Sequence, residues 1–144
     1  MTIPTKELQG FAKSVKQELW NNIVPFWDTY CFNDLSQVNG CVSNDLRVIE
    51  DANVSLILTT RLLWTFSTLY RVSGESGLLS RARDVYRFLM HTFHDQDYGG
   101  FYWMLDHTGK SIDRKKKFYG QAFTIYGLVE YFLAVGEQRA LETA

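Results

Sequence analysis

The chain has 144 residues and a mass of 16.7 kDa, and 46% of its residues are hydrophobic, which is typical of one globular domain and excludes a disordered chain. The formal net charge of -1 and the pI near 6.3 exclude a general electrostatic attraction to nucleic acid or to an anionic membrane. No apolar segment approaches the ~20 residues of a membrane helix, and the segment Met1–Glu7 has neither the basic stretch nor the apolar run of a signal peptide. We therefore expect a cytoplasmic protein that binds neither nucleic acid nor membrane.

The first predicted helix runs from about residue 5 to residue 30. Its apolar residues recur at steps of three and four, which is the spacing of an amphipathic helix: Leu8, Phe11, Val15, Leu19, Ile23 and Phe26. Pro25 should bend or end this helix. The segment that follows, to about Asp51, carries Asn, Asp and Gly between short apolar runs, which predicts turns and short strands.

Two cysteines lie in this region, Cys31 and Cys41, and neither has another Cys or a His at metal-ligand spacing. In a reducing cytoplasm we expect two free thiols, with a disulfide between them as the alternative. We expect neither a metal nor a cofactor.

The second and third predicted helices differ in their polarity. From Val54 to Val72, apolar residues cover most of the helix circumference, so this helix should be buried on nearly all sides. After Gly74 and Gly77, residues 78–93 carry an apolar stripe on one side only. The opposite side should face water, because it carries charged residues: Arg81, Arg83, Asp84 and Arg87.

A β-hairpin is predicted at residues 101–113, with its turn at Asp106–Gly109. The fourth predicted helix runs from about Tyr119 to Val135 and is apolar nearly all round. The second and fourth helices end alike, at Gly74 and Gly136, and the interval between these two glycines is the period of one helix pair. Paired outer and inner helices with such a period are typical of α/α toroids and solenoids, whose repeats need neighbours to cover their open faces.

Aromatic residues gather at the start of the fourth helix, in Phe118–Leu128, directly after the aromatic stretch Tyr98–Asp106. A sugar-binding cleft is made of such parts, because the apolar face of a pyranose stacks on rings while its hydroxyls need amide, phenol and charged partners. An ordinary core helix with large side chains is the alternative, since apolar cores use the same residues.

Short segments over nearly the whole chain carry a family resemblance: Ile23-Val-Pro-Phe-Trp27, Ser43-Asn-Asp45, Arg61-Leu-Leu-Trp-Thr-Phe-Ser67, Tyr70-Arg71, Asp95, Tyr98-Gly-Gly-Phe-Tyr-Trp103, Asp106, Gly109, Tyr119-Gly-Gln-Ala-Phe123 and Tyr126-Gly-Leu128. In this order and spacing they resemble the N-acylglucosamine 2-epimerase superfamily, most closely the cellobiose 2-epimerases. The resemblance implies an all-α (α/α)6 barrel of six outer and six inner helices with short β-hairpins at their connections. Residues 1–144 would then be a single partial domain, two helix pairs and a short tail from the N-terminal part of the barrel, because six pairs need about 370 residues.

The resemblance also implies a cofactor-independent isomerase that inverts C2 of an aldose. In cellobiose 2-epimerases this aldose is the reducing-end glucose of a β-1,4-linked disaccharide. Arg61 matches the family's active-site arginine and Tyr119 a substrate-contacting tyrosine, while Trp103 and Gln121 are further candidates for substrate binding. A structural ion pair for Arg61, a capping or core role for Tyr119, and packing for the other two are the alternatives.

The two catalytic histidines of the family lie on later helices of the barrel. His91, His94 and His107 do not replace them, and each is expected to be a surface histidine. We therefore expect part of a sugar 2-epimerase that is inactive by itself; a non-catalytic helical module that binds a sugar or a protein partner is the alternative. In either case the two all-apolar helices predict self-association.

Overall fold

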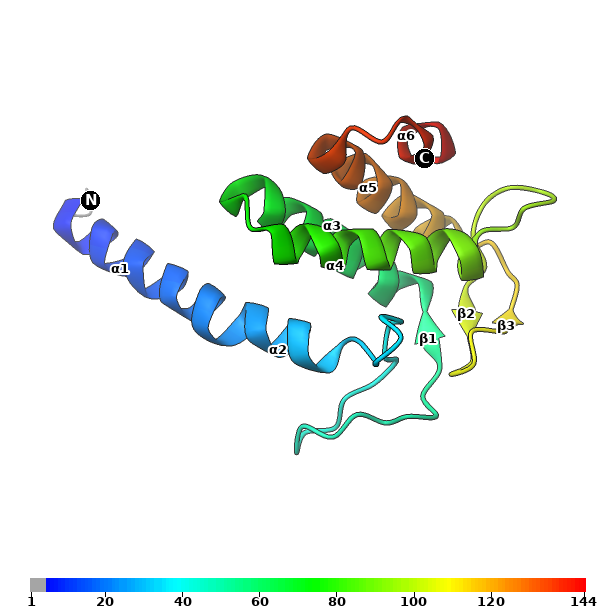
Figure 1. Ribbon diagram of the computed structural model, residues 1–144, viewed down its shortest axis with the longest axis horizontal. Helices are drawn as coiled ribbons and strands as arrows, with labels where there is room; N and C mark the ends of the chain where they lie inside the picture. The colour runs from blue at the N-terminus through cyan, green and yellow to red at the C-terminus, as the bar shows by residue number, and fades with distance from the viewer. Residues whose placement is uncertain (1–4) are drawn as a thin grey trace.

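Helices make up most of residues 5–144, the part of the chain that the computed structural model describes (Figure 1). Residues 1–4, on which the expectation about a signal peptide partly rests, lie outside this range. Within the described residues, no helix is both long enough and apolar enough to cross a membrane.

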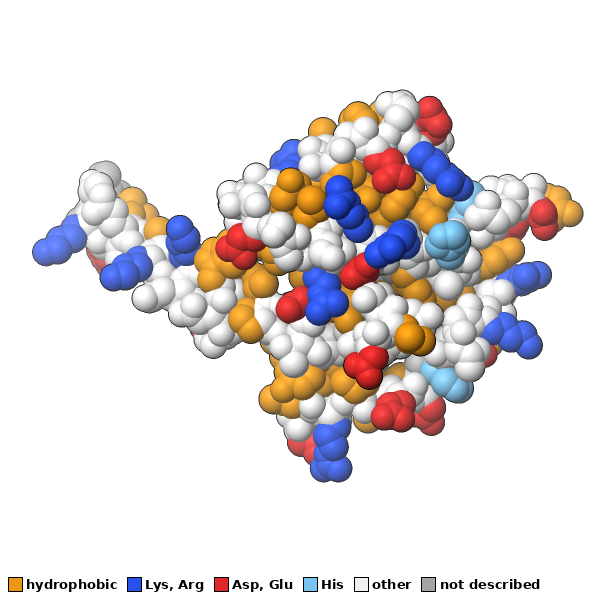
Figure 2. Space-filling view, viewed as in Figure 1, with side chains coloured by type: hydrophobic (Ala, Val, Ile, Leu, Met, Phe, Trp, Pro, Cys, Tyr) orange, Lys and Arg blue, Asp and Glu red, His pale blue; other side chains and the backbone are white. Residues whose placement is uncertain are grey.

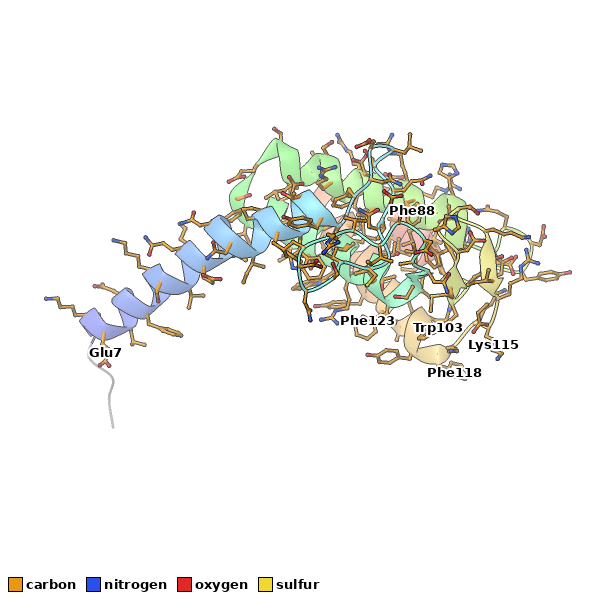
Figure 3. The ribbon with its side chains drawn as sticks, turned by 90° about the horizontal axis from the view of Figure 1, so that it is seen from below. Glu7, Phe88, Trp103, Lys115, Phe118 and Phe123 are labelled. Carbon is orange, nitrogen blue, oxygen red and sulfur yellow. The ribbon has the colours of Figure 1, made fainter. Side chains whose placement is uncertain are left out.

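The predicted first helix is confirmed, but its hydrogen-bond register changes on the way. Helix α1 (Thr5–Glu18) leads into a π-helical turn, η1 (Leu19–Ile23), and then into α2 (Val24–Tyr30). Pro25 lies in the first turn of α2, where its missing N–H costs little, and the wider π-turn precedes it. These three elements form an arm, and its α1 end stands clear of the body in Figures 1, 2 and 3; no side chain of α1 is buried.

Two turns of similar layout follow the arm, as predicted. Isolated β-bridges close them at residues 32–38 and 42–48. Cys31 and Cys41 are free thiols at the start of each turn, the first buried and the second exposed. Burial raises the pKa of Cys31 to about 12, so this thiol stays protonated and packs as a small apolar side chain.

The two central helices, α3 (Leu56–Ser73) and α5 (Phe118–Val135), confirm the positions of the predicted second and fourth helices and pack side by side. The expected burial of the second helix on nearly all sides is wrong, because Arg61 and Val72 are exposed. Gly120 of α5 lies against the first turn of α3, and Gly127 lies against the second, so the helices are parallel. A Cβ atom at Gly127 would lie 2.8 Å from the carbonyl oxygen of Thr60. Only glycine permits so close an approach of the two backbones.

The predicted period of one helix pair is a structural repeat. Helices α3 and α5 both end at a left-handed glycine, Gly74 (φ 75°) and Gly136 (φ 72°), whose N–H donates to the carbonyl four residues back at 2.7 Å. Helices α4 (Ser76–Phe88) and α6 (Gln138–Thr143) then begin at equivalent positions, each two residues after its glycine. Each repeat is therefore an inner helix followed by an outer helix.

Helix α4 packs its apolar stripe on α3 and continues through a second π-helical turn, η2 (Leu89–Phe93). Arg83 and Arg87 lie toward solvent, as the predicted wet face requires. Asp84 was expected on that face too, and this prediction is wrong, because Asp84 is 9% exposed. Its carboxylate pairs with Arg87, which compensates the burial of the charge.

A small antiparallel sheet lies at the end of the molecule where α3 and α5 begin (Figure 1). The predicted hairpin is confirmed with shorter strands, β2 (Met104–Leu105) and β3 (Ser111–Asp113). A third strand, β1 (Val54–Ser55), pairs with β2, although Val54 was expected to begin the helix. The helix starts two residues later because the Ser55 hydroxyl caps it, accepting the Leu58 N–H at 3.2 Å.

Candidate functional site

Four aromatic rings line one face of α3 and α5, and we call this set the aromatic wall: Trp64, Tyr119, Phe123 and Tyr126. Trp64 and Tyr126 stack with centroids 5.1 Å apart and planes 13° apart. Phe123 contacts its two tyrosine neighbours edge-on, at 4.9 Å from Tyr119 and 6.5 Å from Tyr126. The tyrosines are 61% and 49% exposed, so the wall presents ring surface and two phenol groups to solvent.

The wall follows from the repeat and from helix periodicity. Trp64 and Tyr126 are one helix-pair period apart, so they hold equivalent positions on two parallel neighbours. On α5, residues 119, 123 and 126 are spaced by four and three, which places their side chains on one face. The sequence interpretation selected Tyr119 alone from the wall. The period is the signal that would have added Trp64 and Tyr126.

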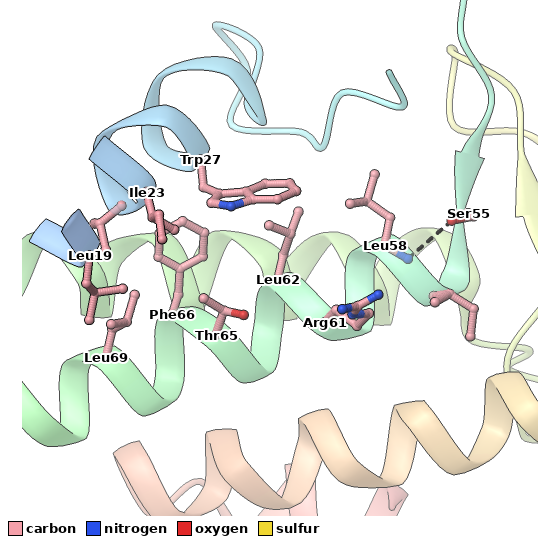
Figure 4. A pocket seen from close by; sticks show the side chains of 12 residues that line it. Leu19, Ile23, Trp27, Ser55, Leu58, Arg61, Leu62, Thr65, Phe66 and Leu69 are labelled. Atoms are coloured by element: carbon pink, nitrogen blue, oxygen red, sulfur yellow. Dashed lines mark hydrogen bonds between the residues drawn. The ribbon is translucent and has the colours of Figure 1, made fainter. Parts of the chain in front are cut away.

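Arg61 lies in a groove of about 510 Å³ between the arm and α3 (Figure 4). Apart from Arg61 the groove is mainly apolar, lined by Leu19, Ile23 and Trp27 of the arm and by Leu58, Leu62, Thr65, Phe66 and Leu69 of α3. Arg61 is exposed and makes no hydrogen bond or salt bridge through its side chain with any residue from 5 to 144. The guanidinium is therefore open to a ligand, and no ion pair of the described chain occupies it.

Trp103 lies on the hairpin beside the start of α5 (Figure 3). A Cβ atom at Gly120 would lie 3.2 Å from the ring and 2.9 Å from Leu56, so the ring packs closely on the start of α5. Lys117 places its Nζ 3.9 Å from the ring centroid, a cation–π contact, and also lies 3.9 Å from the Asp113 carboxylate. A sugar that stacks on Trp103 has to share the ring with this ammonium group.

Gln121 joins α5 to the loop before the hairpin. Its Oε1 accepts the Phe101 N–H at 2.9 Å, and its Nε2 donates to the Phe101 carbonyl at 2.8 Å. Gln121, Trp103 and Tyr119 thus come together around the start of α5. None of the three lines the groove that contains Arg61.

Asp95 stabilises the same loop, residues 95–101, at its other end. Its carboxylate accepts the backbone N–H groups of Asp97 and Tyr98 and pairs with Lys116 at 2.7 Å. The Lys116 ammonium lowers the pKa of Asp95 to about 2, helped by the two backbone donors. The start of α5, and with it Tyr119, is therefore held by both Gln121 and Asp95.

The three histidines lie away from both the groove and the wall. His91 is exposed on η2 and His107 is exposed in the hairpin turn, as predicted. His94 is half-buried, so its prediction as a surface residue is wrong: it packs on the Phe101 ring at 5.0 Å, with its Nδ1 2.9 Å from Gln96. Burial lowers the pKa of His94. Among residues 5–144, no group of three His, Cys, Asp or Glu side chains could hold a metal ion.

Comparisons with known proteins agree with this architecture. Residues 39–144 match the N-acylglucosamine 2-epimerase (GlcNAc 2-epimerase) family. The cellobiose 2-epimerase of Dictyoglomus turgidum is 36% identical over 138 residues, which are 96% of this chain and 36% of that protein.

Two solved cellobiose 2-epimerases have the same fold over almost all of this chain. The structure from Spirochaeta thermophila has a TM-score of 0.92 and 30% identity, and covers 99% of this chain and 35% of its own. The structure from Bacillus thermoamylovorans has a TM-score of 0.89 and 38% identity, and covers 94% and 35%. These enzymes are (α/α)6 barrels, and the chain spans about a third of the length of the relatives it matches.

Proposed function

The chain belongs to the N-acylglucosamine 2-epimerase family, and we propose that it forms the first third of a sugar 2-epimerase of the cellobiose 2-epimerase type. The proposed reaction inverts C2 of a reducing-end aldose, and the proposed substrate is a mono- or disaccharide such as cellobiose. The observation that carries the proposal is the open Arg61 guanidinium on α3, one of the two parallel helices that carry the exposed aromatic wall.

The chemistry of C2 inversion explains why these groups are suitable. The sugar ring opens, a base removes the C2 proton to give an enediolate, and a proton returns to the opposite face. The C1 carbonyl takes up the electrons, so the protein has to stabilise a developing oxyanion and needs no cofactor for this step. The guanidinium of Arg61 has donors free for O1 and O2, and in this proposal it supplies that stabilisation.

The residues around the start of α5 would bind the sugar. We propose that the Tyr119 ring and hydroxyl contact the substrate and that Trp103 offers a second ring beside it. Gln121 contributes by holding α5 on the loop at residues 95–101, since both ends of its amide bond to Phe101.

The 144-residue chain alone is expected to be inactive. The reaction needs a base on each face of C2, and none of the three histidines lies in the groove or on the wall. No C2 epimerisation of cellobiose, lactose, mannose or N-acetylmannosamine should be detectable with this chain by itself. Turnover that survives Arg61→Ala would show that the assignment of Arg61 is wrong.

A chimera tests the proposed function directly. Residues 1–144 replace the matching first third of the Dictyoglomus turgidum cellobiose 2-epimerase, and epimerisation of cellobiose is followed by proton NMR, with mannose as a second substrate. We expect turnover of cellobiose, and a loss of about 10²–10³ in kcat for Arg61→Ala, as when one group that stabilises an oxyanion is removed.

The matched control in the chimera is Arg47→Ala. Arg47 is exposed and, among residues 5–144, its side chain pairs only with Asp45 in the second turn, so its loss should leave the rate unchanged. A chimera that folds as the parent enzyme does but has no activity on either sugar would contradict the proposed function.

The exposed wall also supports a second candidate, a module that binds a sugar without converting it. Titration of the chain with cellobiose, followed by tryptophan fluorescence, would then give a saturable signal that Trp64→Phe removes. An inactive chimera together with such binding would favour this candidate over the epimerase.

A further inference from the structure

We propose that three copies of this chain associate head to tail and close a ring of six helix pairs. The front edge of each copy is the groove between the arm and α3, and the back edge is the uncovered side of α5. In this arrangement α5 of one copy lies in the groove of the next, as α3 lies against α5 within one chain.

The front edge has the residue positions of a surface that already binds an inner helix. On α5, the residues that contact α3 include Gly120 and Gly127. One period earlier, the equivalent residues of α3 are Leu58 and Thr65, and both line the groove. The other buried residues on that face of α5 also have their α3 equivalents in the groove: Leu62, Phe66 and Leu69. The groove is therefore the surface on which a further inner helix would pack.

The back edge is the matching surface. The α3 atoms nearest to Gly120 and Gly127 of α5 belong to Leu56, Thr60 and Leu63. One period later, the equivalent residues of α5 form the back edge: Phe118, Ala122 and Ile125. Phe118 is 93% exposed and Ile125 is 47% exposed, and large apolar side chains exposed together on one helix face indicate a contact surface.

A second copy fits the groove because the two edges are repeats of the two surfaces that meet inside the chain. Among residues 5–144, no inner helix covers the front edge, and the back edge of a second copy offers one with the required face. Such a contact joins different surfaces of two identical chains, so it repeats from copy to copy and closes when the rotations complete a circle. Each copy holds two helix pairs and matches about a third of a six-pair barrel, so three copies complete the ring.

The contact between copies should be looser than the contact between α3 and α5. Leu58 and Thr65 stand where α5 has glycines, so the docked helix lies farther from α3. We therefore expect the ring to dissociate on dilution.

Size-exclusion chromatography with light scattering, run on the 144-residue chain at tens of micromolar, tests the proposal. We expect a mass three times that of the single chain, which is 16.7 kDa. Ile125→Asp at the back edge and Thr65→Arg at the front edge should each give a monomer. Leu35→Asp, at a 77% exposed side chain on neither edge, is the control that should leave the trimer intact.

Mixing the two edge variants separates a head-to-tail contact from any symmetric dimer. The Ile125→Asp chain keeps its front edge and the Thr65→Arg chain keeps its back edge, so an equimolar mixture should form one 1:1 complex with twice the mass of the single chain. Circular dichroism shows that each variant is folded, and Phe118→Asp replaces Ile125→Asp if that variant is not.

Four results would overturn the proposal. They are a monomeric or dimeric wild-type chain, a trimer that either edge variant leaves intact, an open filament, and a mixture of variants that stays monomeric. The result does not depend on whether the chain takes part in sugar epimerisation, so the failure of one proposal leaves the other standing.

Discussion

Arg61 and Gln121 were both predicted to belong to the substrate site, but their side chains have different local contacts. The Arg61 side chain has no partner among residues 5–144 and lies exposed in a groove where all the other side chains are uncharged, so water solvates the guanidinium in the described chain. Gln121 has its amide bound at both ends to Phe101. The first residue is open to a ligand, and the second contributes mainly to the placement of α5.

Replacement of Gln121 by Leu should destabilise the fold. The change leaves the N–H and the carbonyl of Phe101 without partners in a half-buried place, which costs about 1–3 kcal/mol of unfolding free energy. Urea unfolding followed by circular dichroism measures the loss. Gln138→Leu, at an exposed side chain of α6, is the matched control and should change stability by less than about 0.5 kcal/mol. Equal effects of the two changes would contradict a structural role for Gln121.

The Asp95 carboxylate should make stability depend on acid pH. Its pKa is lowered to about 2 in the folded chain, against about 3.9 for a free Asp side chain. The stabilisation is therefore present above about pH 4 and is lost as the pH falls toward 2. Asp95→Asn lacks it at every pH, so the difference in Tm between wild type and variant should shrink on acidification from pH 7 to pH 3.

Asp34→Asn is the control for this pH series, because Asp34 is exposed and makes no salt bridge with residues 5–144. Its Tm difference from wild type should stay constant with pH. A constant difference for Asp95→Asn as well would show that the Lys116 pair adds nothing to stability.

At the scale of single residues, the polarity of a side chain did not predict its burial. Arg61 and Tyr119 were selected through a family resemblance, and no spacing rule would have found them. Asp84 and His94 were both placed on a wet surface by their polarity. Their burial depends on contacts with Arg87 and with Phe101, which helical periodicity does not report.

The close packing of α3 on α5 depends on Gly127, where the two backbones come nearest to each other. Replacement of this glycine should therefore destabilise the helix pair. In Gly127→Ala the new Cβ would lie 2.8 Å from the backbone oxygen of Thr60, which cannot move aside as a side chain can. We expect a loss of about 1–3 kcal/mol in unfolding free energy, the usual cost of overpacking. Chemical denaturation measures it.

Gly77→Ala is the matched control for the helix pair, since nothing lies within 4 Å of a Cβ atom at Gly77. This change should not lower the unfolding free energy and should raise it by up to about 1 kcal/mol, because alanine favours the helix. If Gly127→Ala were equally harmless, the close backbone contact between α3 and α5 would be in error.

The helices could be predicted because their hydrophobic residues recur with a helical period over many residues. A strand of two residues is too short to show such a pattern. The four helical segments and the glycine caps follow from spacing alone. Strand β1 has two residues and pairs with β2, which lies far along the chain, so no local pattern marks it. The π-turns were not predicted either, although Pro25, which follows the first of them, indicated a bend or an end of the helix.

The molecule as a whole has one packed body and one partly free arm. Leu19, Trp20, Val24 and Trp27 of η1 and α2 pack against the core, but α1 buries nothing. Its apolar stripe, with Phe11 68% exposed, is the stripe that predicted an amphipathic helix. Periodicity thus identified the apolar face of α1, and only the fold shows that no other part of the described chain covers this face.

The arm should therefore differ in local stability along its length. An isolated helix of about 12–15 residues is marginal in water, and α1 has 14 residues without a buried side chain. At dilutions where the chain is monomeric, hydrogen exchange of the α1 amides should be nearly unprotected. Exchange in α3 should be slower by about 100-fold or more, because α3 opens only with the core. Protection in η1 and α2 should lie between the two, since their side chains reach the core. Equal protection of α1 and α3 in the monomer would mean that the arm packs on the body.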